Sequence, residues 1–139
     1  MKKIFRREIS RGICIKCNKV LLCKSKVRSN FFFIGGGIEQ GETPEQALIR
    51  EVFEETHLIC SINNKIGIFD NKYAIEESKI IIEKIHLYCI YIDDDNIIND
   101  KISKEYHIDF FWKSMEEIKE LSIKPDFLKP FLKNYDEKQ

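Results

Sequence analysis

The sequence predicts one α/β domain in which helices sandwich a mixed β-sheet. Segments rich in β-branched and aromatic residues come before and after one well-marked helix, and two helical segments follow at the end of the chain. The chain has 139 residues, a length that fits a single hydrophobic core. We therefore expect one domain spanning residues 1–139.

The first third of the chain is predicted to form strands. Residues 9–27 alternate β-branched residues and cysteines around a short polar turn at Asn18 and Lys19, a pattern typical of a β-hairpin. Residues 30–37 add a short aromatic strand that ends in three glycines, where the backbone can turn freely and approach a ligand.

Residues 43–56 carry the clearest helix signal. Thr43 is expected as the N-cap, Pro44 occupies the first helical position, and Gln46 stands three residues after the cap. Threonine and glutamine at this spacing can each bond the backbone of the other, which makes a capping box. The helix is therefore expected to begin at this threonine.

Further strands and two helices are expected to complete the domain. A second capping box, made by Ser114 and Glu117, opens a short helix. Pro125 opens a last amphipathic helix, which Pro130 strains. The expected strands span residues 57–74, 78–92 and 104–112, and the expected helices span residues 115–121 and 125–135.

The charge balance argues against several classes of partner. The 23 basic and 23 acidic residues cancel, whereas proteins that bind along nucleic acid need a basic face. The sequence also has no apolar run long enough for a membrane span and no apolar N-terminal segment typical of a secretion signal. We expect a cytoplasmic protein with no membrane partner and no extended nucleic-acid partner; both monomer and homodimer stay open.

The five cysteines predict reduced, buried thiols rather than a disulfide framework. Their number is odd, and they are scattered among hydrophobic segments. Cys14 and Cys17 form one C-x-x-C pair, but no second pair and no neighbouring histidine pair completes a tetrahedral zinc site.

One edge of helix 43–56 concentrates acidic side chains. At about 100° per residue, Glu51, Glu54 and Glu55 share an arc of about 100° beside the apolar stripe. A solvated helix face is the ordinary interpretation, yet like charges at this spacing repel, and these acids stand next to the stripe instead of opposite it. Arg50 precedes Glu54 by four residues, so its planar fork can pair with that carboxylate. The stripe consists of Leu48, Ile49, Val52 and Phe53.

Clustered oxygens of this kind suit a hard divalent cation. Carboxylates and the backbone carbonyls of a glycine turn are the ligands that Mg²⁺ and Mn²⁺ prefer, and such ions also bind substrate phosphates. Metal binding would remove the repulsion between the acids. The pattern therefore indicates a metal site beside the glycine turn.

The same residues resemble the signature of a known family. Gly36, then Glu42, then the run REVFEETHL from Arg50 to Leu58 is similar to the signature of the Nudix hydrolases, and GETPEQALIRE is especially similar to the MutT branch. The resemblance implies a Nudix-type α/β/α sandwich around a mixed sheet. It also implies a Mg²⁺-dependent or Mn²⁺-dependent pyrophosphohydrolase that cleaves a nucleoside diphosphate linked to another group, such as a nucleoside triphosphate.

The resemblance also implies roles for individual residues. Arg50 would orient the acids, while Glu42 would brace the loop and, with Gly37, face the substrate. Phe32 could stack on a base, because alternation along its strand points Phe31 and Phe33 to the core. The implied metal ligands are Glu51, Glu54, Glu55 and the carbonyl of Gly36.

The general base is expected outside the signature, at a position that varies between branches of the family. Glu105, in the strand before the tryptophan, is the candidate, with Glu76, Glu77 and Glu83 as alternatives. Each of these acids also fits an ordinary surface position.

Two positions depart from the family pattern. His57 stands where the family usually has a helix-closing glycine, at an expected cost of about 1 kcal/mol. Ile34 replaces the proline that usually precedes the glycines, which is expected to loosen the loop. Neither change removes an implied metal ligand.

Two other functions stay open at this stage. One is a Nudix-fold module that senses a nucleotide without cleaving it, although such a module has no need for all three acids. The other is a pyrophosphohydrolase of capped RNA, against which the zero net charge argues.

Overall fold

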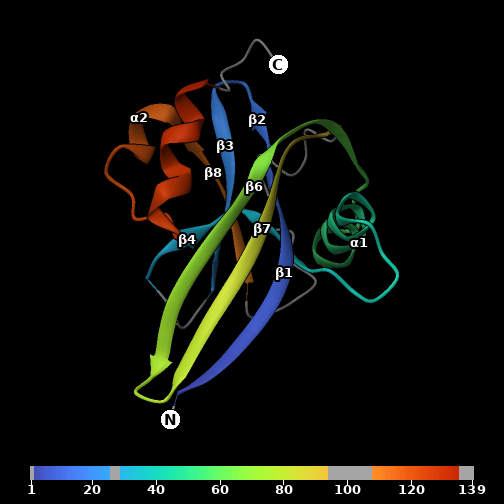
Figure 1. Ribbon diagram of the computed structural model, residues 1–139. Helices are drawn as coiled ribbons and strands as arrows, with labels where there is room; N and C mark the ends of the chain where they lie inside the picture. Colours follow the sequence, from blue (N-terminus) through green and yellow to red (C-terminus); the bar gives the residue numbers. More distant parts are fainter. Residues whose placement is uncertain (1, 26–28, 94–107, 135–139) are drawn as a thin grey trace.

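The computed structural model describes residues 2–25, 29–93 and 108–134, which form two four-stranded sheets with helices on both sides (Figure 1). The strands are β1 (Lys3–Ile13), β2 (Ile15–Lys16), β3 (Lys19–Ser25), β4 (Phe31–Phe32), β5 (Ile34–Gly37), β6 (Cys60–Glu76), β7 (Lys79–Ile92) and β8 (Ile108–Ser114). The helices are α1 (Pro44–Thr56), α2 (Met115–Ile118) and the 3-10 helix η2 (Asp126–Asn134).

The first sheet is mixed, as the sequence predicts. Its strand order is β5-β1-β7-β6, and β1 runs parallel to β7 while the other neighbours are antiparallel. The parallel register pairs Lys3 with Lys79 and Ile13 with Cys89. The second sheet has the order β2-β3-β4, and β8 also pairs with β3.

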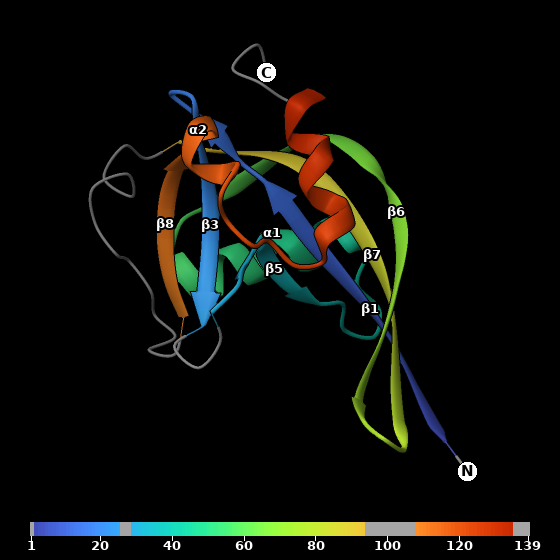
Figure 2. The same ribbon diagram turned by 90° about the vertical axis from the view of Figure 1, so that its left-hand side faces the viewer.

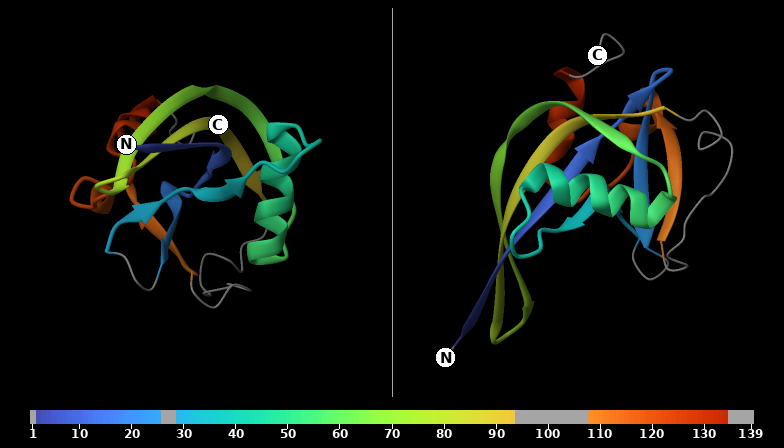
Figure 3. Two further views of the ribbon diagram at one scale, coloured as in Figure 1. Left: turned by 60° about the horizontal axis from the view of Figure 1, so that its bottom comes forward. Right: turned by 90° about the vertical axis from the view of Figure 1, so that its right-hand side faces the viewer.

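Helices lie on opposite sides of these sheets. Helix α1 packs against β1, β5 and β6, whereas α2 and η2 lie on the other side of the molecule (Figure 1 and Figure 3). The β6-β7 hairpin and the start of β1 extend together beyond the helices, which Figure 2 shows from the side. None of the helices in the described part of the chain is long and apolar enough to cross a membrane.

The predicted hairpin forms, but its turn lies one residue earlier than expected. Cys17 and Asn18 have positive φ values of 53° and 61°, as a two-residue turn with the twist of the flanking strands requires. This turn leaves Cys17 exposed, so the prediction that all five thiols are buried was wrong at this position. The other four thiols are buried, and none of the five cysteines forms a disulfide. Burial raises the pKa of Cys14 to about 12.

Helix α1 begins and ends where the sequence predicts. The side chain of Thr43 accepts a hydrogen bond from the backbone N–H of Gln46, and the Gln46 side chain accepts one from the backbone N–H of Thr43, so the capping box is confirmed. His57 closes the helix in the left-handed conformation at φ 62°, and its N–H donates to the Phe53 carbonyl. A histidine therefore takes the conformation that usually selects glycine.

The apolar stripe of α1 is narrower than expected. Leu48 and Val52 are fully buried, but Ile49 and Phe53 are 36% and 49% exposed. Only the strip of the helix that packs against β1, β5 and β6 is covered. Phe53 instead stacks on His57 with ring centroids 5.5 Å apart.

The C-terminal segments differ from prediction in helix type and length. The capping box of Ser114 and Glu117 is confirmed, although α2 ends at Ile118. The last helix is a 3-10 helix with Pro130 inside it. Proline lacks the N–H that an α-helix interior needs, which accounts for the change of helix type.

Candidate functional site

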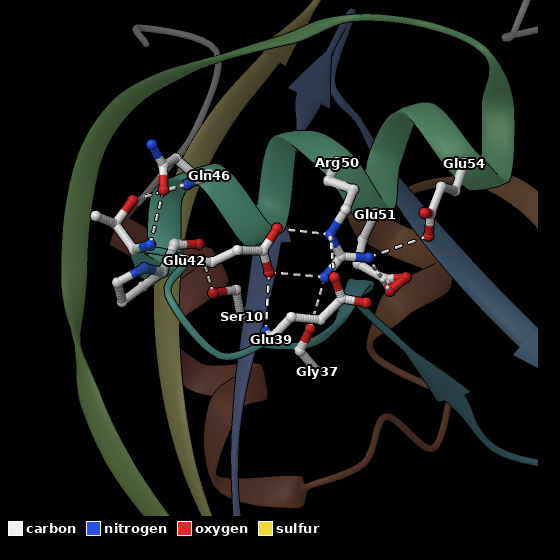
Figure 4. A network of polar contacts seen from close by, with 10 residues as sticks. Ser10, Gly37, Glu39, Glu42, Gln46, Arg50, Glu51 and Glu54 are labelled. Carbon is white, nitrogen blue, oxygen red and sulfur yellow. Dashed lines mark hydrogen bonds and ion pairs between the residues drawn. The ribbon is translucent and has the colours of Figure 1, made fainter.

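Arg50 is the centre of a polar network on the exposed side of α1 (Figure 4). Its Nε and Nη2 atoms donate to the two carboxylate oxygens of Glu42 at 2.6 and 2.9 Å. It also donates to Glu54 Oε1 at 3.1 Å and to the Gly37 carbonyl at 2.9 Å. Helical spacing predicts the pair of Arg50 with Glu54. The two-point contact of Arg50 with Glu42 also connects the helix to the loop that precedes it.

Glu42 ties the loop before α1 together. Its carboxylate accepts from the Glu39 backbone N–H at 2.9 Å in addition to the two bonds from Arg50. The hydrogen bonds from Arg50, followed by the one from Glu39, lower the pKa of Glu42 to about 2. The carboxylate is therefore ionised at neutral pH and fixes the loop against the helix.

We expect the pair of Glu42 with Arg50 to make the stability of the protein depend on pH. Glu42 has an ordinary pKa of 4.5 and a folded pKa of about 2, so the unfolded chain binds more protons between these values. The contribution is complete above about pH 4.5 and is lost as the pH falls towards 2. Denaturant unfolding at several pH values should show Glu42→Gln less stable than wild type at pH 7, with the difference closing in acid. Glu120→Gln, at an exposed position, serves as control, and a constant difference for Glu42→Gln would contradict the prediction.

Glu51 lies against the glycine strand. A Cβ atom built on Gly36 would stand 2.2 Å from Glu51 Oε2, so the carboxylate occupies the space that a side chain at position 36 would take. Glu51 is also 3.7 Å from Arg50 Nη1. Gly36 and Glu51 are therefore neighbours, as the resemblance implies. Glu51 lies on the capped helix α1, and Gly36 lies on β5, which its pairing with β1 holds in place.

The three helix acids lie in different surroundings. The side chain of Glu54 is about half exposed, whereas Glu55 is buried at 3% exposure. Within the described ranges, no three metal-ligating side chains are gathered closely enough to hold an ion. Arg50 contacts both Glu51 and Glu54 instead, so the cation of its side chain balances the acids. The donors are all oxygens on one helix and its glycine strand, which fits the chemistry of Mg²⁺ or Mn²⁺.

The other sequence candidates have separate locations. Phe31 and Phe33 are buried as expected, and Phe32 is half-buried at the wall of a cleft. Glu76 and Glu77 are exposed at the turn of the β6-β7 hairpin. Glu105 lies outside the described residues.

Glu83 is a buried acid rather than a surface one. It is 4% exposed and accepts from Arg7 Nε at 2.6 Å and from the Tyr73 hydroxyl at 3.1 Å. Asn71 Nδ2 donates to its other oxygen at 3.3 Å. These partners come from β1 and β6 on either side of β7, so only the strand order, which single-sequence patterns do not give, could have revealed them.

Glu83 stands in a cleft of about 910 Å³ between the two sheets and the segment before η2. Alternate residues of β1 line one wall, and strands β4, β6 and β8 supply further side chains. The cleft-lining residues used below are Arg7, Arg11, Phe32, Tyr73, Lys124 and Phe127. The volume is that of a pocket for a small organic ligand.

Comparisons with known proteins find relatives that are named as pyrophosphatases. Among curated relatives, the ADP-ribose pyrophosphatase of Methanocaldococcus jannaschii is 41% identical over 63 residues, which are 43% of this chain and 37% of that protein. The RNA pyrophosphohydrolase of Actinobacillus succinogenes is 43% identical over 54 residues, which are 39% of this chain and 27% of that protein. The matches thus span only about a third of the length of these relatives.

Solved structures show the same fold at low identity. The MutT protein of Methanosarcina mazei superposes with a TM-score of 0.67 at 19% identity, over 96% of this chain and 95% of that one. The MutT protein of Bacillus halodurans superposes with a TM-score of 0.65 at 21% identity, over 94% of this chain and 84% of that one. The model of the NUDIX domain matches residues 6–135. The chain therefore belongs to the Nudix family.

Proposed function

We propose that this protein hydrolyses the diphosphate bridge of a nucleotide, with Mg²⁺ or Mn²⁺ bound by the acids of α1. The observation that carries the proposal is the contact between Glu51 and the Gly36 backbone, next to Arg50 and Glu54. It brings carboxylates next to the glycine strand β5, which pairs with β1, and β1 also lines the cleft of about 910 Å³. The pyrophosphatase names of the relatives support the same reaction class.

The residues that would hold the metal are Glu51, Glu54, Glu55 and the Gly36 carbonyl. A bound divalent cation supplies charge neutralisation at the phosphate oxygens and a water molecule that ionises near neutral pH. Arg50 holds Glu54 through a charged hydrogen bond and keeps the loop in place through Glu42 and Gly37. The protein thus contributes fixed positions and charge rather than a covalent intermediate.

A substrate panel with controlled metal content tests the proposal. The purified protein is incubated with nucleoside triphosphates, ADP-ribose, dinucleoside polyphosphates and sugar nucleotides, each with Mg²⁺, Mn²⁺ or a chelator. We expect release of phosphate products from at least one class, with the chelator abolishing it. Absence of metal-dependent cleavage across the panel, while nucleotides still bind, would instead identify a sensing module.

RNA is a second candidate substrate, because several relatives carry the name RNA pyrophosphohydrolase. The zero net charge of the chain weakens this candidate, since binding along RNA needs basic residues. A short RNA with a 5′-triphosphate belongs in the same panel. Cleavage of that RNA faster than of the free nucleotide would favour it.

A further inference from the structure

Arg11 is the one charged group of the cleft without an ionic partner among the described residues. Arg7 pairs with Glu83, and Lys124 Nζ lies 3.1 Å from Asp126 Oδ2. By contrast, no carboxylate oxygen of the described residues lies within 4.0 Å of the Arg11 guanidinium. Within the described residues, the Arg11 guanidinium donates a hydrogen bond from Nη1 to the Phe33 carbonyl at 3.2 Å. A guanidinium carries five N–H donors, so most of them are available to a ligand.

The surroundings of Arg11 explain why hydrogen bonds from its N–H groups to a ligand would be favourable. The side chain is half-buried, and burial lowers its pKa, while Cys23, Glu55 and Glu83 partly offset this effect. A guanidinium withdrawn from water loses hydration that only new hydrogen bonds can replace. A group with acceptor atoms entering the cleft would therefore be drawn to this position.

The walls of the cleft suit a flat ring. The guanidinium carbon of Arg11 lies 5.4 Å from the centre of the Phe32 ring, which holds the two side chains together. Tyr73 and Phe127 also line the cleft. Aromatic walls favour stacking with a nucleobase, and stacking alone does not distinguish one base from another.

Strand β1 connects this cleft to the acids. Arg11 pairs with Gly35 in the β1-β5 register, and its neighbour Ser10 pairs with Gly36, against which Glu51 lies. A base beside Arg11 therefore lies one residue along β1 from the pair of Ser10 with Gly36, and Glu55 of α1 is near enough to Arg11 to offset part of the lowering of its pKa by burial.

We propose, on the basis of the function proposed above, that Arg11 selects the nucleobase and favours guanine, uracil and thymine over adenine, because these three bases carry a carbonyl oxygen at the position where adenine carries an amino group. Arginine offers donors only, and guanine presents two adjacent acceptors that match its fork. Adenine places an amino donor beside its ring acceptor, so one donor of arginine faces another donor.

Binding of nucleoside monophosphates tests this selectivity without relying on hydrolysis, because these ligands lack the diphosphate bridge. Titration calorimetry should show GMP and UMP bound at least about 5-fold more tightly than AMP by the wild-type protein. Arg11→Met should weaken the binding of GMP and UMP about 10-fold and change the affinity for AMP less than about 2-fold. Arg6→Met, an exposed arginine on the same strand that does not line the cleft, should leave all three affinities unchanged.

Several results would overturn the proposal. If Arg11→Met weakened the binding of all three nucleotides equally, the arginine would contact the sugar and phosphate that they share. If the wild-type protein bound all three with the same affinity, Arg11 would not select the base at all. Arg11→Lys, which keeps the charge but loses the planar fork, should retain binding with a reduced preference and covers the case in which Arg11→Met does not fold. Loss of hydrolysis across the panel with this preference intact would contradict only the function proposed above.

Discussion

Glutamine in place of Glu54 is expected to lower the rate of nucleotide hydrolysis by at least about 100-fold while leaving the protein folded. The change keeps the size of the side chain and removes the charge with which it would bind the metal. A metal-bound transition state loses several kcal/mol when a ligand is lost, and about 2.7 kcal/mol corresponds to about 100-fold. Initial rates with Mg²⁺ and the affinity for Mn²⁺ are the two measurements.

Stability separates this effect from a structural one. The Glu54 side chain is 49% exposed, and its contact with Arg50 is a surface ion pair worth roughly 0–1 kcal/mol. The melting temperature should therefore fall by no more than about 4 °C. Glu45→Gln, in the first turn of the same helix, is the matched control and should keep the wild-type rate. A wild-type rate for Glu54→Gln would remove this carboxylate from the reaction.

The features that the sequence predicted correctly are those set by short spacings. Thr43 with Gln46, and Ser114 with Glu117, form their capping boxes because the groups concerned are three residues apart on one helix. The contact of Arg50 with Glu54 follows from the four-residue spacing for the same reason. Such local rules place the acids on α1 and place α1 after the glycines.

The cleft depends on contacts that no local pattern contains. Arg7 and Glu83 are 76 positions apart and meet because β1 runs parallel to β7. A parallel pairing leaves no turn signal in the sequence, since the chain connects the two strands through other elements. Glu83 therefore looked like a surface acid, and Arg11 gave no signal at all, although the cleft brings both together.

The strongest contact of Arg50 was also underestimated. Helical spacing identified Glu54, but the shorter bonds go to Glu42 in the preceding loop. Loop conformation decides this pairing, and it depends on the hydrogen bond from the Glu39 backbone. The resemblance to the Nudix signature, rather than helix geometry, was what pointed to Glu42.

Alanine in place of Gly36 is expected to impair the reaction without unfolding the protein. The added Cβ would lie 2.2 Å from Glu51 Oε2 and 2.4 Å from its carboxyl carbon, so the carboxylate must move. The end of a glutamate side chain is flexible and can move aside at little cost in stability. Since displacements of about 1 Å can cost about 100-fold in rate, we expect a loss of about 10-fold to 100-fold together with weaker Mn²⁺ binding.

The two neighbouring glycines supply controls with opposite outcomes for stability. At Gly35, φ is 146° and a Cβ would stand 1.9 Å from the Ser10 carbonyl oxygen, so Gly35→Ala should destabilise the fold by about 3 kcal/mol or more. At Gly37, no atom lies within 4 Å of the added carbon, so Gly37→Ala should stay within about 1 kcal/mol of wild type. Denaturant unfolding of all three variants measures this difference. If Gly36→Ala unfolded as readily as Gly35→Ala, its loss of activity would reflect the fold, and the contact with Glu51 would no longer explain it.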